Sequence, residues 1–401
     1  MVNKTIKVLL VIVVFIEVVY ASELNLNSKR YILYNMNDNV ILDSKDEHDE
    51  VSIASLTKIM TVIVAIENID NFDEIITIKN SMINDIDWDV AKVGFKVGEK
   101  VTYNDLLYAS ILYSGTDAVN ALAESIKGSR QEFVDLMNQK VKELSLENTH
   151  FSNVVGLYSK DNYSSAYDMA QILIYALKNN KFREVFETKT YILSNGKKIK
   201  STIESYNKKM NRDISFIKGA KTGYINKSGY CLASIASLNG VNYLLITLNA
   251  YSDSYTVHIK DHIDAYNYYN DNYSYKYIVC DEDTIVSLKT KYAKEKTIDI
   301  KANTNIKKYL NNSFDKSKIE YDYFGNDEIS YFLKKNTKLG KVKIKYNNEY
   351  IDEFDLIYYG ALTFSLKDYL LDNKYSLILL IVFIILITYT KIFNRKKQLK
   401  S

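Results

Sequence analysis

The spacing of apolar residues predicts helices in the first half of the chain. Residues 56–67 are apolar on nearly every side, which is typical of a helix buried on all of its faces. Further segments show a helical period, with Ser114 and Gly115 separating the first two. These segments cover residues 103–113, 117–127 and 166–178. The pattern therefore predicts a helical lobe.

Segments with a strand pattern precede and follow this lobe. Residues 31–35 and 39–43 are predicted strands joined through Asn37 and Asp38. Short β-rich runs then occur at Tyr191–Leu193, Ser215–Ile217, Tyr230–Ile235 and Tyr243–Leu248. Asn239-Gly240 is a strong signal for a hairpin turn between the last two runs. A helix over 257–268 closes the unit. The fold class predicted for residues 22–272 is α/β, with an antiparallel sheet and a helical lobe.

Beyond about residue 275 the pattern changes again. Apolar and polar residues alternate in short runs, as in Val342–Tyr346, and Gly and Asn separate the runs. This pattern predicts a smaller, all-β C-terminal domain over residues 276–360.

Two long apolar segments lie near the ends of the chain. Lys4 and Lys7 precede an apolar stretch that ends near Ala21, so residues 1–21 are a predicted signal peptide, with a retained membrane anchor as the alternative. Residues 375–393 have the length needed to span a bilayer, and basic residues follow them. We expect an exported protein on the extracytoplasmic face of the membrane, held by a C-terminal transmembrane helix.

Composition narrows the class of ligand. The chain has 52 Lys and Arg against 49 Asp and Glu, a net charge of +3 that does not favour nucleic acid as a partner. The four histidines show no metal-ligand pattern, since the His258/His262 pair lacks the adjacent glutamate of a zinc protease helix. We therefore expect neither a metal nor an organic cofactor.

Three short motifs suggest the chemistry. Lys221-Thr222-Gly223 occurs once, and Ser114-Gly115-Thr116 precedes it. Ser-x-x-Lys occurs five times, starting at Ser55, Ser194, Ser205, Ser215 and Ser313. Only Ser55 opens a long apolar segment, so only this copy is a candidate for a site.

Ser55 and Lys58 suit nucleophilic catalysis. A helix places residues three apart on one face, and a serine hydroxyl needs a nearby base. A lysine serves as that base only when burial lowers its pKa, and Leu56, Ile59 and Met60 offer an apolar environment. The alternative for Lys58 is a surface position on an amphipathic helix. The alternative for Ser114 is a simple helix cap.

The order of these motifs resembles the signature of penicillin-binding proteins and serine β-lactamases. The stretch Ala54–Thr61 resembles the nucleophile region of serine-type D-alanyl-D-alanine carboxypeptidases, the low-molecular-weight penicillin-binding proteins. Further segments look like the same family, namely Tyr31–Ser44, Tyr163–Asp168 and Lys221–Tyr224 followed by Gly229-Tyr230-Cys231. The resemblance is strong over residues 24–270 and looser to about residue 360.

The resemblance implies a β-lactamase/transpeptidase-like fold and a hydrolase that removes the terminal D-alanine from peptidoglycan stem peptides. In this reading Ser55 forms an acyl-enzyme, β-lactams inhibit it, and Ser114 helps to pass the proton to the leaving amine. The oxyanion hole uses the backbone N–H groups of Ser55 and Tyr224. The β-rich domain holds the catalytic domain off the membrane.

Substrate contacts are expected mainly from the Lys221-Thr222-Gly223 motif. Lys221 and Thr222 suit a terminal carboxylate, and Gly223 allows close approach of the substrate backbone. No arginine lies between Arg212 and Arg395, so Lys227 is a further candidate for binding the carboxylate.

Thr116 departs from the family pattern, which has Asn at this position. Asn offers an amide donor and a carbonyl acceptor, whereas Thr offers one hydroxyl on a shorter side chain. One alternative is therefore a penicillin-binding fold that binds peptidoglycan with little or no turnover. Another alternative is a β-lactamase, which would need a deacylation base, and the sequence has no match to the glutamate loop of class A enzymes.

Overall fold

The computed structural model describes residues 24–88, 90–210 and 212–398. The predicted signal peptide, residues 1–21, lies outside the described residues. The chain divides into two compact units between Asp271 and Asn272.

An antiparallel sheet forms the centre of the first unit, with the strand order β2-β1-β9-β8-β7. Its strands are β1 (Ser28–Asn35), β2 (Val40–Lys45), β7 (Ile217–Ile225), β8 (Gly229–Leu238) and β9 (Val241–Ala250). The turn predicted at Asn239-Gly240 is confirmed, because both residues have a positive φ, 47° and 82°, between β8 and β9. Strand β7 lies at one edge of the sheet.

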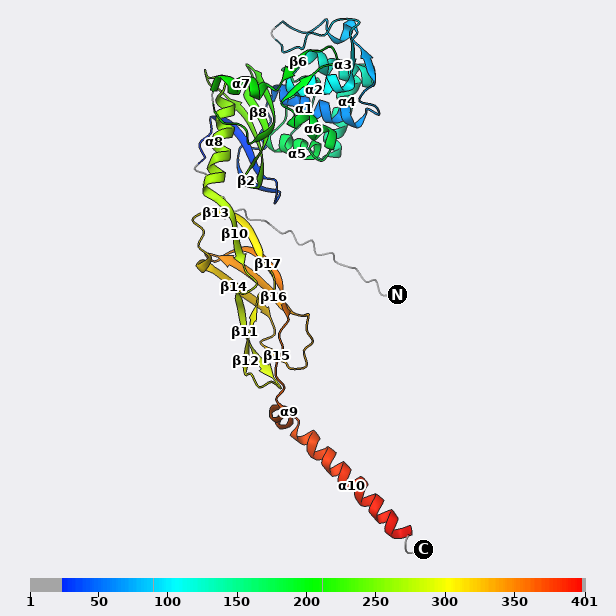
Figure 1. Ribbon diagram of the computed structural model, residues 1–401, viewed down its shortest axis with the longest axis vertical. Helices are drawn as coiled ribbons and strands as arrows, with labels where there is room; N and C mark the ends of the chain where they lie inside the picture. The colour runs from blue at the N-terminus through cyan, green and yellow to red at the C-terminus, as the bar shows by residue number, and fades with distance from the viewer. Residues whose placement is uncertain (1–23, 89, 211, 399–401) are drawn as a thin grey trace, which may run out of the picture. The chain divides into compact units, whose positions relative to one another are not determined.

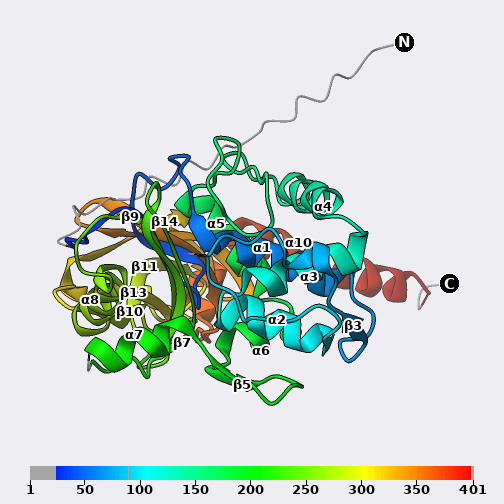
Figure 2. The same ribbon diagram turned by 90° about the horizontal axis from the view of Figure 1, so that it is seen from above.

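The predicted helical lobe covers one face of this sheet (Figures 1 and 2). Its helices are α1 (Thr57–Glu67), α2 (Tyr103–Leu112), α3 (Thr116–Lys127), α4 (Arg130–Glu143), α5 (Ala166–Ala176) and α6 (Asn180–Glu187). Alternating residues of β9 point to opposite faces. Leu244 and Ile246 join the core of the helical lobe. Thr247 instead contacts His262 of α8 (Val257–Asn272) on the other face, with 3.0 Å between Oγ1 and Nε2.

Several elements differ from the predicted ones. Helices α4, α6 and α7 (Thr202–Met210) were not predicted, because polar residues dominate them and only a narrow stripe is apolar. The run Ser215–Ile217 was predicted as a strand, but β7 begins only at Ile217. The Ser215 N–H donates to the Asp213 carboxylate at 2.8 Å, which favours a turn before the strand.

Shorter elements complete the first unit. Two small two-stranded antiparallel sheets are formed by β3 (Ile75–Thr77) with β4 (Lys100–Thr102), and by β5 (Thr190–Ile192) with β6 (Lys198–Lys200). Single 3₁₀ turns occur at η1 (Ala54–Leu56) and η2 (Asn80–Met82).

The second unit is rich in strands, which confirms the predicted all-β domain. Its strands are β10 (Tyr273–Val279), β11 (Thr284–Lys291), β12 (Thr297–Lys301), β13 (Ile306–Asn311), β14 (Ile319–Gly325), β15 (Glu328–Ser330), β16 (Thr337–Tyr346) and β17 (Glu349–Tyr358), with a 3₁₀ turn η3 (Lys316–Lys318). Alternating residues such as Val342 and Ile344 form its core.

Two helices follow these strands, α9 (Leu366–Asp372) and α10 (Lys374–Gln398). Helix α10 contains a 19-residue segment, Lys374–Ile392, with a mean hydropathy of 2.2. By length and composition this segment is able to cross a membrane.

Candidate active site

Ser55 lies in a strained turn at the start of α1. The preceding residue, Ala54, has a φ of +48°, a left-handed conformation that is unfavourable for an L-residue with a side chain. Gly156 packs directly against this turn. A Cβ atom at Gly156 would lie 1.9 Å from the Ala54 carbonyl oxygen, so a side chain at this position would collide with the turn. The Asn153 side chain fixes Gly156 by accepting its N–H at 2.7 Å. The position of Ser55 is therefore set by a loop distant in sequence.

The Lys58 side chain is buried, as its apolar neighbours predict, with 1% of its surface exposed. Its amine donates to the Ser114 carbonyl oxygen at 2.6 Å, and lies 3.2 Å from Ser114 Oγ and 3.5 Å from Thr116 Oγ1. The Ser55 hydroxyl makes no hydrogen bond to any residue that the structure describes. Burial lowers the pKa of Lys58 to about 7, and the negative charge of Asp117 opposes this shift. Lys58 is thus able to hold or release a proton near neutral pH.

Ser114 lies between two lysines. It has a φ of +62° and connects α2 to α3, where Gly115 and not Ser114 occupies the N-cap position. Its hydroxyl accepts a hydrogen bond from the Lys221 amine at 2.8 Å and faces the Lys58 amine. The helix-cap reading of Ser114 is therefore wrong, because its hydroxyl contacts both amines.

Lys221 comes from β7 and is completely buried. Its amine also donates to the Thr222 carbonyl oxygen at 2.8 Å. Burial, and then the nearby charge of Lys58, hold the pKa of Lys221 well below its usual range. Two ammonium groups beside one hydroxyl repel each other, so the arrangement favours the loss of a proton from the pair.

Asp117 is a member of this site that the sequence analysis did not single out. Its buried carboxylate accepts the backbone N–H groups of Val93, Gly94 and Phe95, at 2.9, 2.7 and 3.2 Å. An acidic residue in the first turn of a helix is the signal that could have identified it. Asp117 supplies a negative charge that acts on Lys58, and it fixes segment 93–95 on α3.

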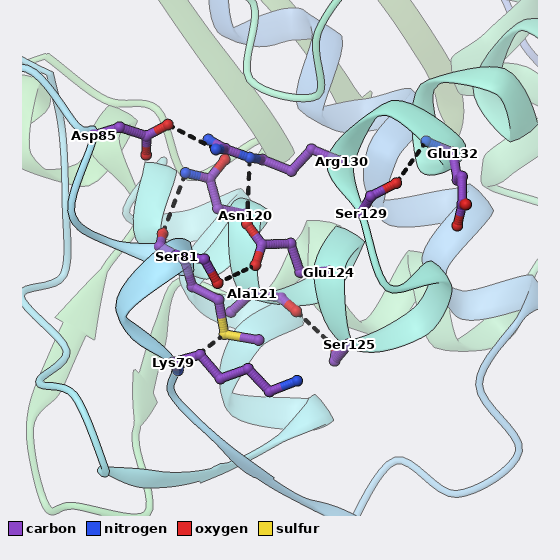
Figure 3. Close-up of polar contacts among 11 residues, drawn as sticks. Lys79, Ser81, Asp85, Asn120, Ala121, Glu124, Ser125, Ser129, Arg130 and Glu132 are labelled. Carbon is purple, nitrogen blue, oxygen red and sulfur yellow. Dashed lines mark hydrogen bonds and ion pairs between the residues drawn. The ribbon is translucent and has the colours of Figure 1, made fainter.

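The same connecting segment is attached to α3 and α4 at its other end (Figure 3). Arg130 pairs with Asp85 at 2.6 Å and with Glu124 at 3.3 Å, and Ser81 donates to Glu124 at 2.7 Å. The hydrogen bond from Arg130 holds the pKa of Asp85 below its usual range. Both ends of the segment from Ser81 to Phe95 are thus attached to α3. The first residue of α3 is Thr116, which contacts Lys58, so this attachment lies next to the site.

The Lys-Thr-Gly segment lies directly against the Ser55 turn. A Cβ atom at Gly223 would be 3.0 Å from the Ser55 backbone nitrogen, so β7 approaches this turn closely and a side chain at position 223 would have to push the turn away. The hydroxyl of Thr222 shares a hydrogen bond of 2.7 Å with that of Thr202 in α7. The Tyr224 side chain is half exposed and donates to the Asn226 side chain at 2.9 Å.

Two pockets lie on either side of the Ser55 turn along β7. The larger one, of about 530 Å³, is lined by Tyr113, by Thr202 and by lysines that include Lys200. It lies beside Thr222, because Thr202 bonds to that residue. The smaller one, of about 320 Å³, includes Ser52 and Lys227, beyond the other end of β7. Lys227 therefore borders a different pocket from the one next to Thr222.

The fold thus brings together a serine in a strained turn, a buried lysine with a lowered pKa, and a second serine between two lysines. Such a hydroxyl and amine suit acyl transfer, in which a nucleophile attacks a carbonyl and a base receives its proton.

Comparisons with family models cover most of the chain. Residues 17–252 match the model described as D-alanyl-D-alanine carboxypeptidase. Residues 273–362 match the model described as penicillin-binding protein 5, C-terminal domain.

Individual relatives agree with these models. The chain is 30% identical over 271 residues to the D-alanyl-D-alanine carboxypeptidase DacF of Bacillus subtilis, covering 66% of this chain and 67% of that protein. It is 35% identical over 145 residues to DacA of Escherichia coli, covering 35% of this chain and 34% of that protein.

Solved structures show the same fold. The structure of the D-alanyl-D-alanine carboxypeptidase DacD from Francisella tularensis superposes with a TM-score of 0.64 at 21% identity, over 86% of this chain and 95% of that one. The Streptomyces K15 DD-transpeptidase superposes with a TM-score of 0.55 at 28% identity, over 61% of this chain and 97% of that one.

Proposed function

This chain belongs to the D-alanyl-D-alanine carboxypeptidase family, and we propose that it removes the terminal D-alanine from peptidoglycan stem peptides through an acyl-enzyme on Ser55. The observation that carries the assignment of residues is Lys58, buried three residues after Ser55 with its pKa lowered to about 7. Such a lysine is the base that a serine nucleophile needs.

The stem peptide binds along the outer edge of β7. An edge strand presents unpaired N–H and C=O groups, with which an extended peptide pairs as an added strand. The terminal carboxylate then lies toward Thr222 and the pocket that Thr202 and Lys200 line. The Lys221 amine is buried against Ser114, so it acts on the carboxylate through its charge and through the Ser114 hydroxyl.

Acylation begins when Ser55 Oγ attacks the carbonyl carbon of the penultimate D-alanine. Its proton passes to Lys58, and the backbone N–H groups of Ser55 and Tyr224 stabilise the oxyanion. Ser114, which contacts both lysine amines, then delivers a proton to the leaving nitrogen as the C–N bond breaks. The terminal D-alanine leaves, and water hydrolyses the acyl-enzyme.

A β-lactam reacts with the same serine. Its amide carbonyl takes the position of the scissile carbonyl, and the leaving nitrogen stays attached to the ring fragment. The leaving group therefore remains in the site, and the adduct persists.

The catalytic unit works outside the cytoplasm. This location follows from the predicted signal peptide and from the nature of the substrate, which is an exported polymer. Helix α10 contains a segment long and apolar enough to be its anchor.

Removing α10 is expected to release an active protein from the membrane. Deletion of residues 373–401 leaves α9 intact, including Asp372, which pairs with Lys291 of β11. We expect the truncated protein to bind a fluorescent penicillin in the soluble fraction, while the full chain fractionates with membranes. A truncated protein that stays with the membrane after cleavage of the signal peptide would show that another anchor exists.

Thr116→Asn is expected to raise the rate of acylation. The Thr116 hydroxyl lies 3.5 Å from the Lys58 amine, at the limit of a hydrogen bond, and the longer Asn side chain reaches further. A hydrogen bond to a charged group contributes roughly 1.5–3 kcal/mol, which is about one to two orders of magnitude in rate. The measurements are acylation by penicillin and release of D-alanine from an acyl-D-Ala-D-Ala peptide.

Thr116→Val is the matched control, because it keeps the shape and removes the hydroxyl. Slower reaction of Thr116→Asn would mean that the site is shaped around threonine. Absence of both turnover and penicillin labelling in the wild type and in Thr116→Asn would identify a peptidoglycan-binding protein without activity and overturn the proposed function.

A further inference from the structure

Two lysines border the smaller pocket without a carboxylate partner. The Lys29 amine lies 5.1 Å from the centre of the Tyr251 ring, and the Lys227 amine lies 5.8 Å from the centre of the Tyr158 ring. Among the described residues neither lysine forms an ion pair. Contact with an aromatic ring leaves the N–H donors of an ammonium group available for an anion.

The third cation of this pocket is already engaged. Arg30 pairs with Asp49 at 2.8 Å and donates to the Asn249 side chain at 3.3 Å. These bonds fix the Arg30 guanidinium in the lining of the pocket. Lys29 and Lys227 are therefore the groups that remain for a ligand.

The pocket lies where the upstream part of a bound stem peptide has to pass. Lys227 follows Gly223 by four residues, and Gly223 contacts the Ser55 turn. An extended chain advances about 3.3 Å per residue, so Lys227 lies at most about 13 Å further along the direction of β7. Tyr158, which also lines the pocket, lies two residues after Gly156, and Gly156 packs against the same turn.

The direction of the substrate follows from the site. With the terminal carboxylate toward Thr222 and the scissile carbonyl at Ser55, the residues that precede D-Ala-D-Ala run toward Lys227. A distance of about 13 Å is spanned by roughly four extended residues or by fewer residues with a long side chain.

We propose that this pocket binds the carboxylate of an acidic residue located one or two positions before D-Ala-D-Ala in the stem peptide. This inference rests on the proposed function. Lys29 and Lys227 supply charge-assisted hydrogen bonds, and Tyr158 and Tyr251 contact the aliphatic part of the acidic side chain. The volume of about 320 Å³ has room for one such residue. The pocket makes the enzyme selective for an acidic stem.

The test compares synthetic peptides that differ in one residue. Pairs of N-acetylated peptides ending in D-Ala-D-Ala carry Glu or Gln at the first or second preceding position, and release of D-alanine gives kcat/KM. For the wild type we expect about a tenfold preference for Glu at one of these positions, since a charge-assisted hydrogen bond contributes at least that factor. The double variant Lys29→Gln/Lys227→Gln is expected to lose the preference, so that its kcat/KM is the same for the Glu and the Gln peptide.

Lys218→Gln is the matched control, because Lys218 is an exposed lysine at the opposite end of β7. It is expected to keep the preference for Glu. Lys29 and Lys227 are exposed too, so the double variant should fold, and an unchanged unfolding temperature checks this.

Other results would overturn the inference. Equal kcat/KM for the Glu and Gln peptides in the wild type would do so while leaving the proposed function intact. Saturable inhibition by inorganic phosphate, lost in the double variant and accompanied by no preference for Glu, would assign the pocket to a separate anion. If no peptide is cleaved and penicillin does not label Ser55, the proposed function fails, and this inference fails with it.

Discussion

Replacing Ser55 with alanine is expected to abolish both the covalent penicillin adduct and the release of D-alanine. The hydroxyl oxygen of Ser55 is the atom that forms the acyl bond in the proposed mechanism, and the adjacent groups cannot replace it. The measurement is labelling with a fluorescent penicillin followed by peptide mapping, together with an assay of D-alanine release. A methyl group in place of the hydroxymethyl leaves the strained backbone at Ala54 unchanged, so the variant is expected to fold.

Ser215→Ala provides a matched control within the same chain. Ser215 and Lys218 have the same Ser-x-x-Lys spacing, but both are exposed. The buried, apolar surroundings of Lys58 are missing at Lys218, so Ser215→Ala should label at the wild-type rate. Labelling that maps to Ser194, Ser205, Ser215 or Ser313 would refute the assignment of Ser55.

The sequence predicts the parts of the fold that depend on a simple apolar pattern. The helix at 56–67 is apolar nearly all round, and α1 is buried along almost its whole length. The Asn239-Gly240 turn was predicted because its conformation depends on two local residues. Helix α4 was missed because its buried stripe is narrow, with Phe133 and Met137 among many charged residues.

The site is only partly predictable, because its contacts connect distant residues. Burial of Lys58 follows from its neighbours, but its contact with Ser114 spans 56 residues, and the contact of Ser114 with Lys221 spans 107. The motif predicts that Lys221 acts on the substrate carboxylate, but it does not show that the Lys221 amine lies against Ser114. The close approach of Gly223 to the backbone of Ser55 is likewise a contact between residues far apart in the sequence. No local pattern contains this information.

Lys58 variants are expected to lose acylation by about 10²- to 10⁴-fold, the usual contribution of a positioned base. Lys58→Arg keeps a positive charge, but a guanidinium does not release its proton in this pH range. Lys58→Met has a similar length and no ionisable group, and suits the apolar surroundings of a side chain that is 1% exposed. It therefore separates loss of the base from misfolding, which the unfolding temperature of each variant checks.

The pH dependence gives a second test of the same residue. Only the neutral amine accepts a proton, so kcat/KM for acylation of the wild type should rise with pH through about 7 and level off above it. At one pH unit below this pKa about a tenth of the amine is neutral, and the rate falls by the same factor. Lys221 is the competing candidate, because burial and Lys58 lower its pKa too. If Lys58→Met retains the rise near pH 7 at nearly the wild-type rate, then Lys221 is the base. Loss of the rate together with the loss of that rise assigns the proton transfer to Lys58.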